Sequence, residues 1–183
     1  MPVKPVFKLR GLLVLPPVLF AALCYKWEFE KDTATWAVGG TVFLAAVALR
    51  VWAQCHLHYR LRMHKLLTTA GPYRYSRNPI YVANTMLVSS MVWLMELPWL
   101  TLPTVVWCVL VYSAVIRYEE KRLRFNFGDA YARYVSVVPR WLGVRAPSPR
   151  EFPAAHLLWG PALRAEAHCG LFLLLPVVKE MLA

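Results

Sequence analysis

The sequence predicts an all-α integral membrane protein with four to five transmembrane helices. Of its 183 residues 58% are hydrophobic, only 17% are charged, and the charged residues lie between long uncharged runs. A soluble domain usually contains about 45–50% apolar residues, so the excess is expected to face lipid. We expect one domain over residues 1–183, with N-terminal helices at 1–63, a central region at 64–142 and a C-terminal tail at 143–183.

Uncharged runs predict the individual helices, and they lie at residues 11–25, 33–49, 80–95 and 97–116. A spanning helix needs about 17–25 residues, so the first three runs cross a bilayer only with flanking aromatic or basic residues. Glu96, followed by Leu97 and Pro98, predicts a tight hairpin turn between the third and fourth helices. Residues 119–134 predict a further soluble or interfacial helix, and the tail predicts an interfacial helix or a fifth, tilted span.

The basic residues predict the orientation in the membrane. The formal net charge is +11, and Lys and Arg gather in residues 50–79 and 117–150, whereas the hairpin tip carries none. The positive-inside rule therefore places both basic segments on the cytoplasmic side. Membrane topology explains the charge, so we predict no nucleic-acid partner. The four cysteines form no CxxC pair, and we predict no metal site.

The two cytoplasmic segments contain the candidate chemistry. In the first, Gly71-Pro72 and Asn78-Pro79 force the chain to turn just before a membrane helix. In the second, Glu119 and Glu120 directly follow a membrane run, where a carboxylate is costly and usually has a partner or a function. Simpler interpretations remain open at this point. The arginines could anchor lipid headgroups, the tyrosines could form an aromatic belt, and the glutamates could pair with basic neighbours on a solvated helix.

These segments resemble a known superfamily. The pattern L-x-T-x-G-P-Y-R-Y-x-R-N-P-x-Y, a membrane hairpin, and then E-E-x-x-L-x-x-x-F-G-x-x-Y-x-x-Y-x-x-x-V-P-R extend over about residues 64–142. They are similar to the isoprenylcysteine carboxyl methyltransferase and phospholipid methyltransferase superfamily. The resemblance implies a membrane-embedded enzyme that uses S-adenosyl-L-methionine and releases S-adenosyl-L-homocysteine. It also implies a cytoplasmic cofactor pocket between the loop before the third helix and the helix after the fourth.

The resemblance assigns roles to individual residues. It implies that the cofactor is bound by Lys65, Leu67, Thr68, Thr69, Gly71, Tyr73, Asn78, Pro79, Tyr81 and Glu119. Arg77 and Glu120 are the expected catalytic residues, and Arg117 is the expected substrate-binding residue. Carboxyl methyltransferases usually have His at the position of Asn78, and many relatives have Gly at that of Ala83. These departures concern the acceptor more than the cofactor.

Methyl transfer from a sulfonium needs alignment and exclusion of water rather than a metal or a nucleophilic triad. We expect a lipidic or amphipathic acceptor that enters from the bilayer, with an isoprenylcysteine-type carboxylate or similar nucleophile favoured. A phospholipid amine is the alternative, and it would need a general base, for which Glu120 and His64 are the candidates. A non-catalytic protein that binds anionic lipid or a partner is the alternative of another class.

Overall fold

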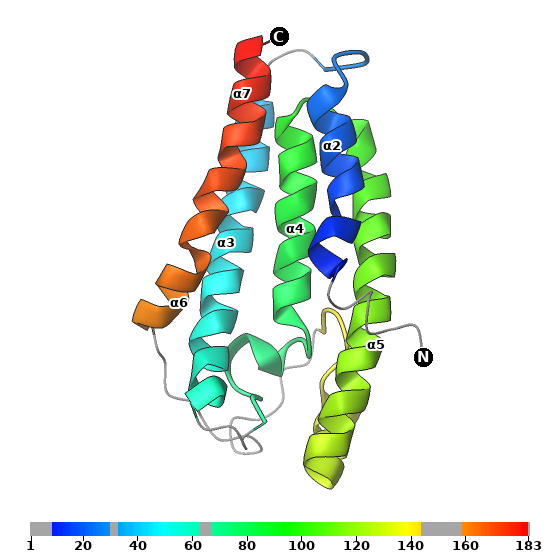
Figure 1. Cartoon of the computed structure of the whole chain (residues 1–183), viewed down its shortest axis with the longest axis vertical. Coiled ribbons are helices and arrows are strands. Elements are labelled where there is room, and N and C mark those ends of the chain that lie inside the picture. Colours follow the sequence, from blue (N-terminus) through cyan, green and yellow to red (C-terminus); the bar gives the residue numbers. More distant parts are fainter. Residues whose placement is uncertain (1–8, 30–32, 63–66, 144–158, 183) are drawn as a thin grey trace. The chain divides into compact units, whose positions relative to one another are not determined.

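The computed structural model describes residues 9–29, 33–62, 67–143 and 159–182, apart from the side chains of residues 58–62. All regular secondary structure in this part of the chain is helical, and this part contains no strand (Figure 1). After a short helical turn at 9–13, its elements in chain order are α2 (Leu15–Leu23), α3 (Thr33–Arg62), η1 (Gly71–Arg74), α4 (Pro79–Leu94), α5 (Pro98–Val137), α6 (Trp159–Glu166), η2 (Ala167–Leu173) and α7 (Leu174–Leu182).

Three helical stretches within the described ranges are long and apolar enough to cross a membrane, and they are Thr33–Leu57, Pro98–Val137 and Trp159–Leu182. The chain is therefore an all-helical, multi-pass membrane protein. The structure supports several membrane spans, but it does not establish the expected number of four to five. Helix α4 has 16 residues and α2 has nine, both below the usual length of about 17–25. Pro79 and the turn at Glu96 limit α4 at its two ends.

The predicted hairpin between the third and fourth runs is confirmed. Helix α4 ends at Leu94 and α5 begins at Pro98. Glu96 turns the chain between them with a φ of 63°, and its backbone N–H donates to the Trp93 carbonyl at 3.0 Å. Proline is favourable in the first turn of a helix because its missing N–H would have no partner there.

The prediction of a separate helix after the fourth span is wrong. Helix α5 continues without a break from the membrane run through Glu119, and its first non-helical residue is Gly128, with φ 48° and ψ −124°. The sequence from 117 to 127 contains neither glycine nor proline, so nothing interrupts the helical hydrogen bonds before that point. Glu119 and Glu120 are therefore held rigidly in mid-helix.

The C-terminal tail is longer and more regular than its short apolar patch suggests. Its helical residues Trp159–Leu182 form one of the three candidate spans, which supports the fifth-span alternative over a short interfacial segment. Lys179 of α7 is buried, donates to the Met95 carbonyl at 2.8 Å and pairs with Glu28 at 2.8 Å. These contacts tie α7 to the loop after α2 and to the α4–α5 turn.

The chain divides into two compact units. The first comprises Met1–Val47, Asn84–Tyr118 and His168–Ala183, and the second comprises Ala48–Ala83 and Glu119–Ala167. The first contains the hairpin turn and the Lys179 contacts. The second contains every predicted site residue except Arg117. A single domain over the whole chain remains a prediction.

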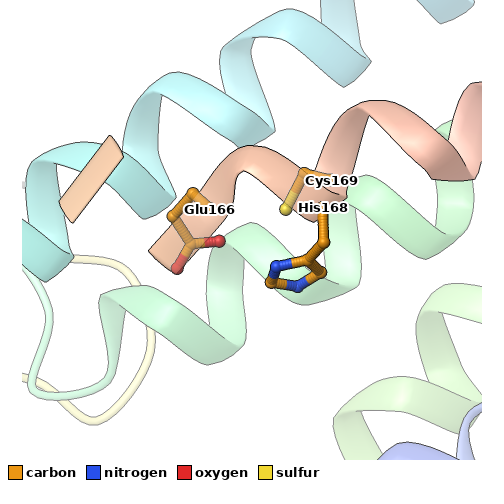
Figure 2. Close-up of side chains that lie close together, drawn as sticks. All are labelled: Glu166, His168 and Cys169. Carbon is orange, nitrogen blue, oxygen red and sulfur yellow. The ribbon is translucent and has the colours of Figure 1, made fainter. Parts of the chain in front are cut away.

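A buried ion pair joins α3 to α6 in the second unit. Arg50 Nε lies 2.6 Å from Glu166 Oε2, with side-chain exposures of 16% and 2%. Figure 2 shows Glu166 with His168 and Cys169, which follow it along the chain. Because Arg50 binds the Glu166 carboxylate, we assign no metal to these side chains. Charged groups at this depth are costly unless they are paired.

We expect Glu166→Ala to lower the free energy of unfolding by about 3–5 kcal/mol, because it removes the carboxylate from a buried guanidinium. Thermal unfolding of the purified protein in detergent measures the change. Glu180→Ala is the matched control, since Glu180 is exposed on α7. Equal melting temperatures for the two variants would show that the Arg50–Glu166 pair contributes nothing to stability.

Candidate functional site

The loop before α4 turns sharply against α3. Gly71 opens η1 with a φ of +61°, and a Cβ atom there would lie 2.3 Å from the His56 imidazole. His56 is buried, and its Nδ1 lies 2.9 Å from the Trp52 carbonyl oxygen. Only glycine combines this backbone conformation with such a close approach. The Gly71-Pro72 turn is therefore fixed by an imidazole beneath it.

Asn78 connects this loop to the segment after α5. Its side-chain Nδ2 donates to the Arg140 carbonyl at 3.0 Å, and its backbone N–H donates to Ser76 Oγ at 3.0 Å. The Asn78 carbonyl accepts the N–H of Tyr81 at 3.0 Å, which starts the hydrogen bonding of α4. Pro79 occupies the first helical position, where its fixed φ suits the helix.

The first turn of α4 meets the middle of α5 at one polar contact. The Tyr81 hydroxyl donates to Glu119 Oε1 at 2.9 Å. Tyr81 is buried and Glu119 is partly buried, so the hydrogen bond is largely shielded from water. A hydrogen bond to a charged acceptor is stronger than a neutral one. The pair therefore holds the Glu119 carboxylate in a defined position.

Glu120 is held between two guanidinium groups. Arg140 donates through Nε to Glu120 Oε1 at 3.2 Å and through Nη2 to Oε2 at 2.6 Å. Arg77 Nη2 lies 3.3 Å from Glu120 Oε1. The hydrogen bond to Glu120 raises the pKa of Arg140. Protonating this carboxylate would leave two cations without their counter-charge, so the geometry argues against Glu120 as a general base.

Residues 138–143 form a strap that lies along the site loop. The backbone N–H of Arg77 donates to the Pro139 carbonyl at 2.9 Å, and that of Gly143 donates to the Tyr75 carbonyl at 3.1 Å. Beneath the strap, Tyr134 donates its hydroxyl to the Tyr73 carbonyl at 2.7 Å. A small core forms here from Tyr131, Tyr134 and Val138, with Leu67, Leu123, Phe127 and Val135 packed against it.

The chain matches the phospholipid methyltransferase family over residues 34–130, which is more than half of its length. It belongs to this family. The match begins within α3, earlier than the predicted start at residue 64, and ends before the strap. The chain is also similar to the cobalt-zinc-cadmium resistance protein CzcN of Cupriavidus metallidurans, with 34% identity over 98 residues. That alignment covers 54% of this chain and 44% of the relative, so the chain spans less than half of that protein. No solved structure matches the chain.

The phospholipid methyltransferase family match gives the chain a place among methyltransferases but leaves the role of each residue as a prediction. The structure places Tyr81 against Glu119 and Arg77 against Glu120. The other predicted residues that it describes in the second unit are Leu67, Thr68, Thr69, Gly71, Tyr73, Asn78 and Pro79. Lys65 lies outside the described residues, as does His64.

Arg117 is the one predicted site residue outside the second unit. It precedes Glu119 by two positions on the same helix, which turns its side chain by about 200° around the axis. It is exposed and belongs to the first unit. Its role as the substrate-binding residue stays a prediction.

Four residues with structural roles at the site carried no role in the sequence prediction. Arg140 binds Glu120, Ser76 and Tyr134 bind backbone groups of the loop and strap, and His56 supports Gly71. The V-P-R pattern at 138–140 was a signal for Arg140. No local pattern identifies His56, because its contact with Gly71 depends on tertiary structure.

Proposed function

We propose that the chain transfers a methyl group from S-adenosyl-L-methionine to a lipidic or amphipathic acceptor. The observation that carries this proposal is the Tyr81–Glu119 hydrogen bond beside the Gly71 turn. A lipid-anchoring surface needs exposed basic residues, but it does not need a shielded carboxylate held by a tyrosine. Membership of the phospholipid methyltransferase family supports the same conclusion.

The described residues fit the cofactor chemically. Glu119 offers a partly buried carboxylate, which can accept hydrogen bonds from ribose hydroxyls or an amino group. Gly71 lets the loop turn tightly against His56, and Tyr73 and Tyr81 supply aromatic rings that attract a cation. When bound, S-adenosyl-L-methionine supplies a methyl group that is already activated on a sulfonium. The chain then has to bind, orient and exclude water.

The acceptor is the less constrained part of the proposal. A carboxylate or a thiolate needs no general base, whereas an amine arrives protonated and needs one. Because Glu120 is paired with two arginines, it is a poor candidate for that base. An isoprenylcysteine-type carboxylate or similar nucleophile therefore remains the favoured acceptor. The family description favours a phospholipid amine, which remains the alternative.

The proposed site faces the cytoplasm. Its segments lie within the two stretches that are richest in Lys and Arg, residues 50–79 and 117–150, and the hairpin turn has none. The positive-inside rule supports this orientation. In bacterial cells, an impermeant maleimide should therefore label a cysteine placed at exposed Asn126 only after the membrane is opened. Labelling of Asn126→Cys in intact cells would contradict this orientation and place the site on the outer side of the membrane.

Calorimetry with S-adenosyl-L-homocysteine and detergent-purified protein tests the proposed function. We expect micromolar binding by the wild-type protein, because the contacts that would hold the cofactor are present without the acceptor. The titration is repeated after total lipid extract is added, in case acceptor and cofactor bind together. A folded protein that binds neither cofactor nor product under both conditions would contradict the proposal and favour the non-catalytic lipid-binding alternative.

A further inference from the structure

The strap at residues 138–143 lies beyond the family match, yet Arg140 contacts three residues of the site. Its guanidinium binds both carboxylate oxygens of Glu120 in α5. Its carbonyl accepts Asn78 Nδ2 at 3.0 Å and Ser76 Oγ at 3.4 Å from the loop before α4. One residue therefore links α5, the loop and the strap.

The strap is held in one register. A Cβ atom at Gly143 would lie 2.3 Å from Pro139 Cγ and 3.3 Å from the Tyr75 carbonyl oxygen. The hydrogen bonds from Arg77 to Pro139 and from Gly143 to Tyr75 fix the two ends. Arg140 lies between these anchors, so its guanidinium approaches Glu120 from a defined direction.

Arg77 is held much less firmly than Arg140. It contacts Glu120 through a single Nη2 at 3.3 Å, and it shares that carboxylate oxygen with Arg140. Its Nε is buried and has no hydrogen-bond partner among the residues that the structure describes. Two fork-like contacts restrain a guanidinium far better than one long contact. The position of Arg77 therefore depends on where Arg140 places Glu120.

We propose that Arg140 is a positioning residue that sets the orientation of the Arg77 guanidinium through Glu120. This proposal rests on the proposed function, and it assigns the Arg77 guanidinium to the polar group of the methyl acceptor. Arg140 then acts on the acceptor side of the reaction, whereas Glu119 acts on the cofactor side. Substituting Arg140 should change methyl transfer and the state of Arg77 but leave cofactor binding nearly intact.

The deciding measurement is the ¹⁵Nε–H resonance of Arg77, assigned through Arg77→Lys. In the wild-type protein the buried Nε–H should give a distinct, slowly exchanging signal. Arg140→Ala and Glu120→Gln should each shift or broaden that signal, and their combination should add little to either. Arg133→Ala is the matched control, because Arg133 is an exposed arginine near the end of α5. An unchanged Arg77 resonance in Arg140→Ala would overturn the proposal.

One further variant and two further readouts separate a positioning role from an effect on stability. Arg140→Lys keeps the positive charge but cannot bind both oxygens of Glu120 as the guanidinium does. The Arg77 signal of this variant should therefore lie between those of the wild type and Arg140→Ala. Arg140→Lys should also fold if Arg140→Ala does not. Affinity for S-adenosyl-L-homocysteine should stay within about threefold of wild type in Arg140→Lys. Methyl transfer to total lipid extract should fall at least tenfold in Arg140→Ala but not in Arg133→Ala. A wild-type protein without cofactor affinity would defeat the proposed function, whereas the Arg77 resonance decides the role of Arg140 independently.

Discussion

Glu119→Ala is expected to weaken binding of S-adenosyl-L-methionine by about 10- to 100-fold, because hydrogen bonds to a charged group contribute about 1.5–3 kcal/mol. The substitution removes the carboxylate that the buried Tyr81 hydroxyl holds in place. Calorimetry on the purified variant measures the loss directly. Glu119→Gln should fall between the wild type and the alanine variant, since its amide oxygen can still accept from Tyr81 while the charge is lost.

Asp129→Asn is the control for a general effect of charge, because Asp129 is exposed on the same helix. It should bind the cofactor as the wild type does. Membrane insertion and melting temperature should be similar for all three variants, since Glu119 is only partly buried. Full cofactor affinity in Glu119→Ala would remove Glu119 from the proposed site.

Gly71→Ala has the second largest expected effect, because it disturbs the turn that places the loop. A Cβ atom would collide with the His56 imidazole, and the left-handed backbone would add strain. Overpacking costs about 1–3 kcal/mol and a left-handed alanine about 1–2 kcal/mol. We expect a lower melting temperature and loss of measurable cofactor binding.

The double variant His56→Ala/Gly71→Ala tests the cause. It should recover part of the lost stability, since the collision is removed while the backbone strain remains. Gly160→Ala is the matched control, because a Cβ atom there would have open space and alanine suits a helix better than glycine. If the double variant is no more stable than Gly71→Ala alone, the contact with His56 is not the source of the damage.

Much of the fold could be predicted because it follows from local chemistry. The α4–α5 turn is predicted by one carboxylate and one proline between two apolar runs, and the structure places it at Glu96. The long apolar helices Thr33–Leu57 and Pro98–Val137 follow from hydropathy, whereas the short apolar patch of the tail does not decide between a span and an interfacial helix. The number of spans was less predictable, because α4 and α2 are short and their membrane depth depends on neighbours rather than on composition.

The sequence does not predict the continuity of α5, because a change from apolar to charged residues resembles the end of a helix. The change from apolar to charged residues after Ile116 marks the membrane surface, but it does not break a helix. Helical hydrogen bonds depend on backbone conformation, and the first residue to leave that conformation is Gly128. Gly128 is the residue in the sequence that indicates where the helix changes direction.

Sequence patterns name candidate residues, whose roles stay predictions, but they do not give the pairings between them. Motif spacing identified Tyr81 and Glu119, yet their contact links residues 38 positions apart. The same is true of Arg140 and Glu120, which are 20 positions apart on either side of the Gly128 kink. Local patterns do not specify which carboxylate meets which partner, because that choice depends on how the helices pack.

The most direct test of the account is transfer of a labelled methyl group. Purified protein in vesicles of total bacterial lipid extract receives S-adenosyl-L-methionine labelled in its methyl group, and the label is followed into the organic phase. The account predicts enzyme-dependent labelling of a lipid or amphipathic product by the wild type and its loss in Glu119→Ala, with Asp129→Asn unchanged. Equal labelling by wild type and Glu119→Ala would contradict the proposed site. Cofactor binding without any labelled product across several lipid sources would contradict the proposed reaction.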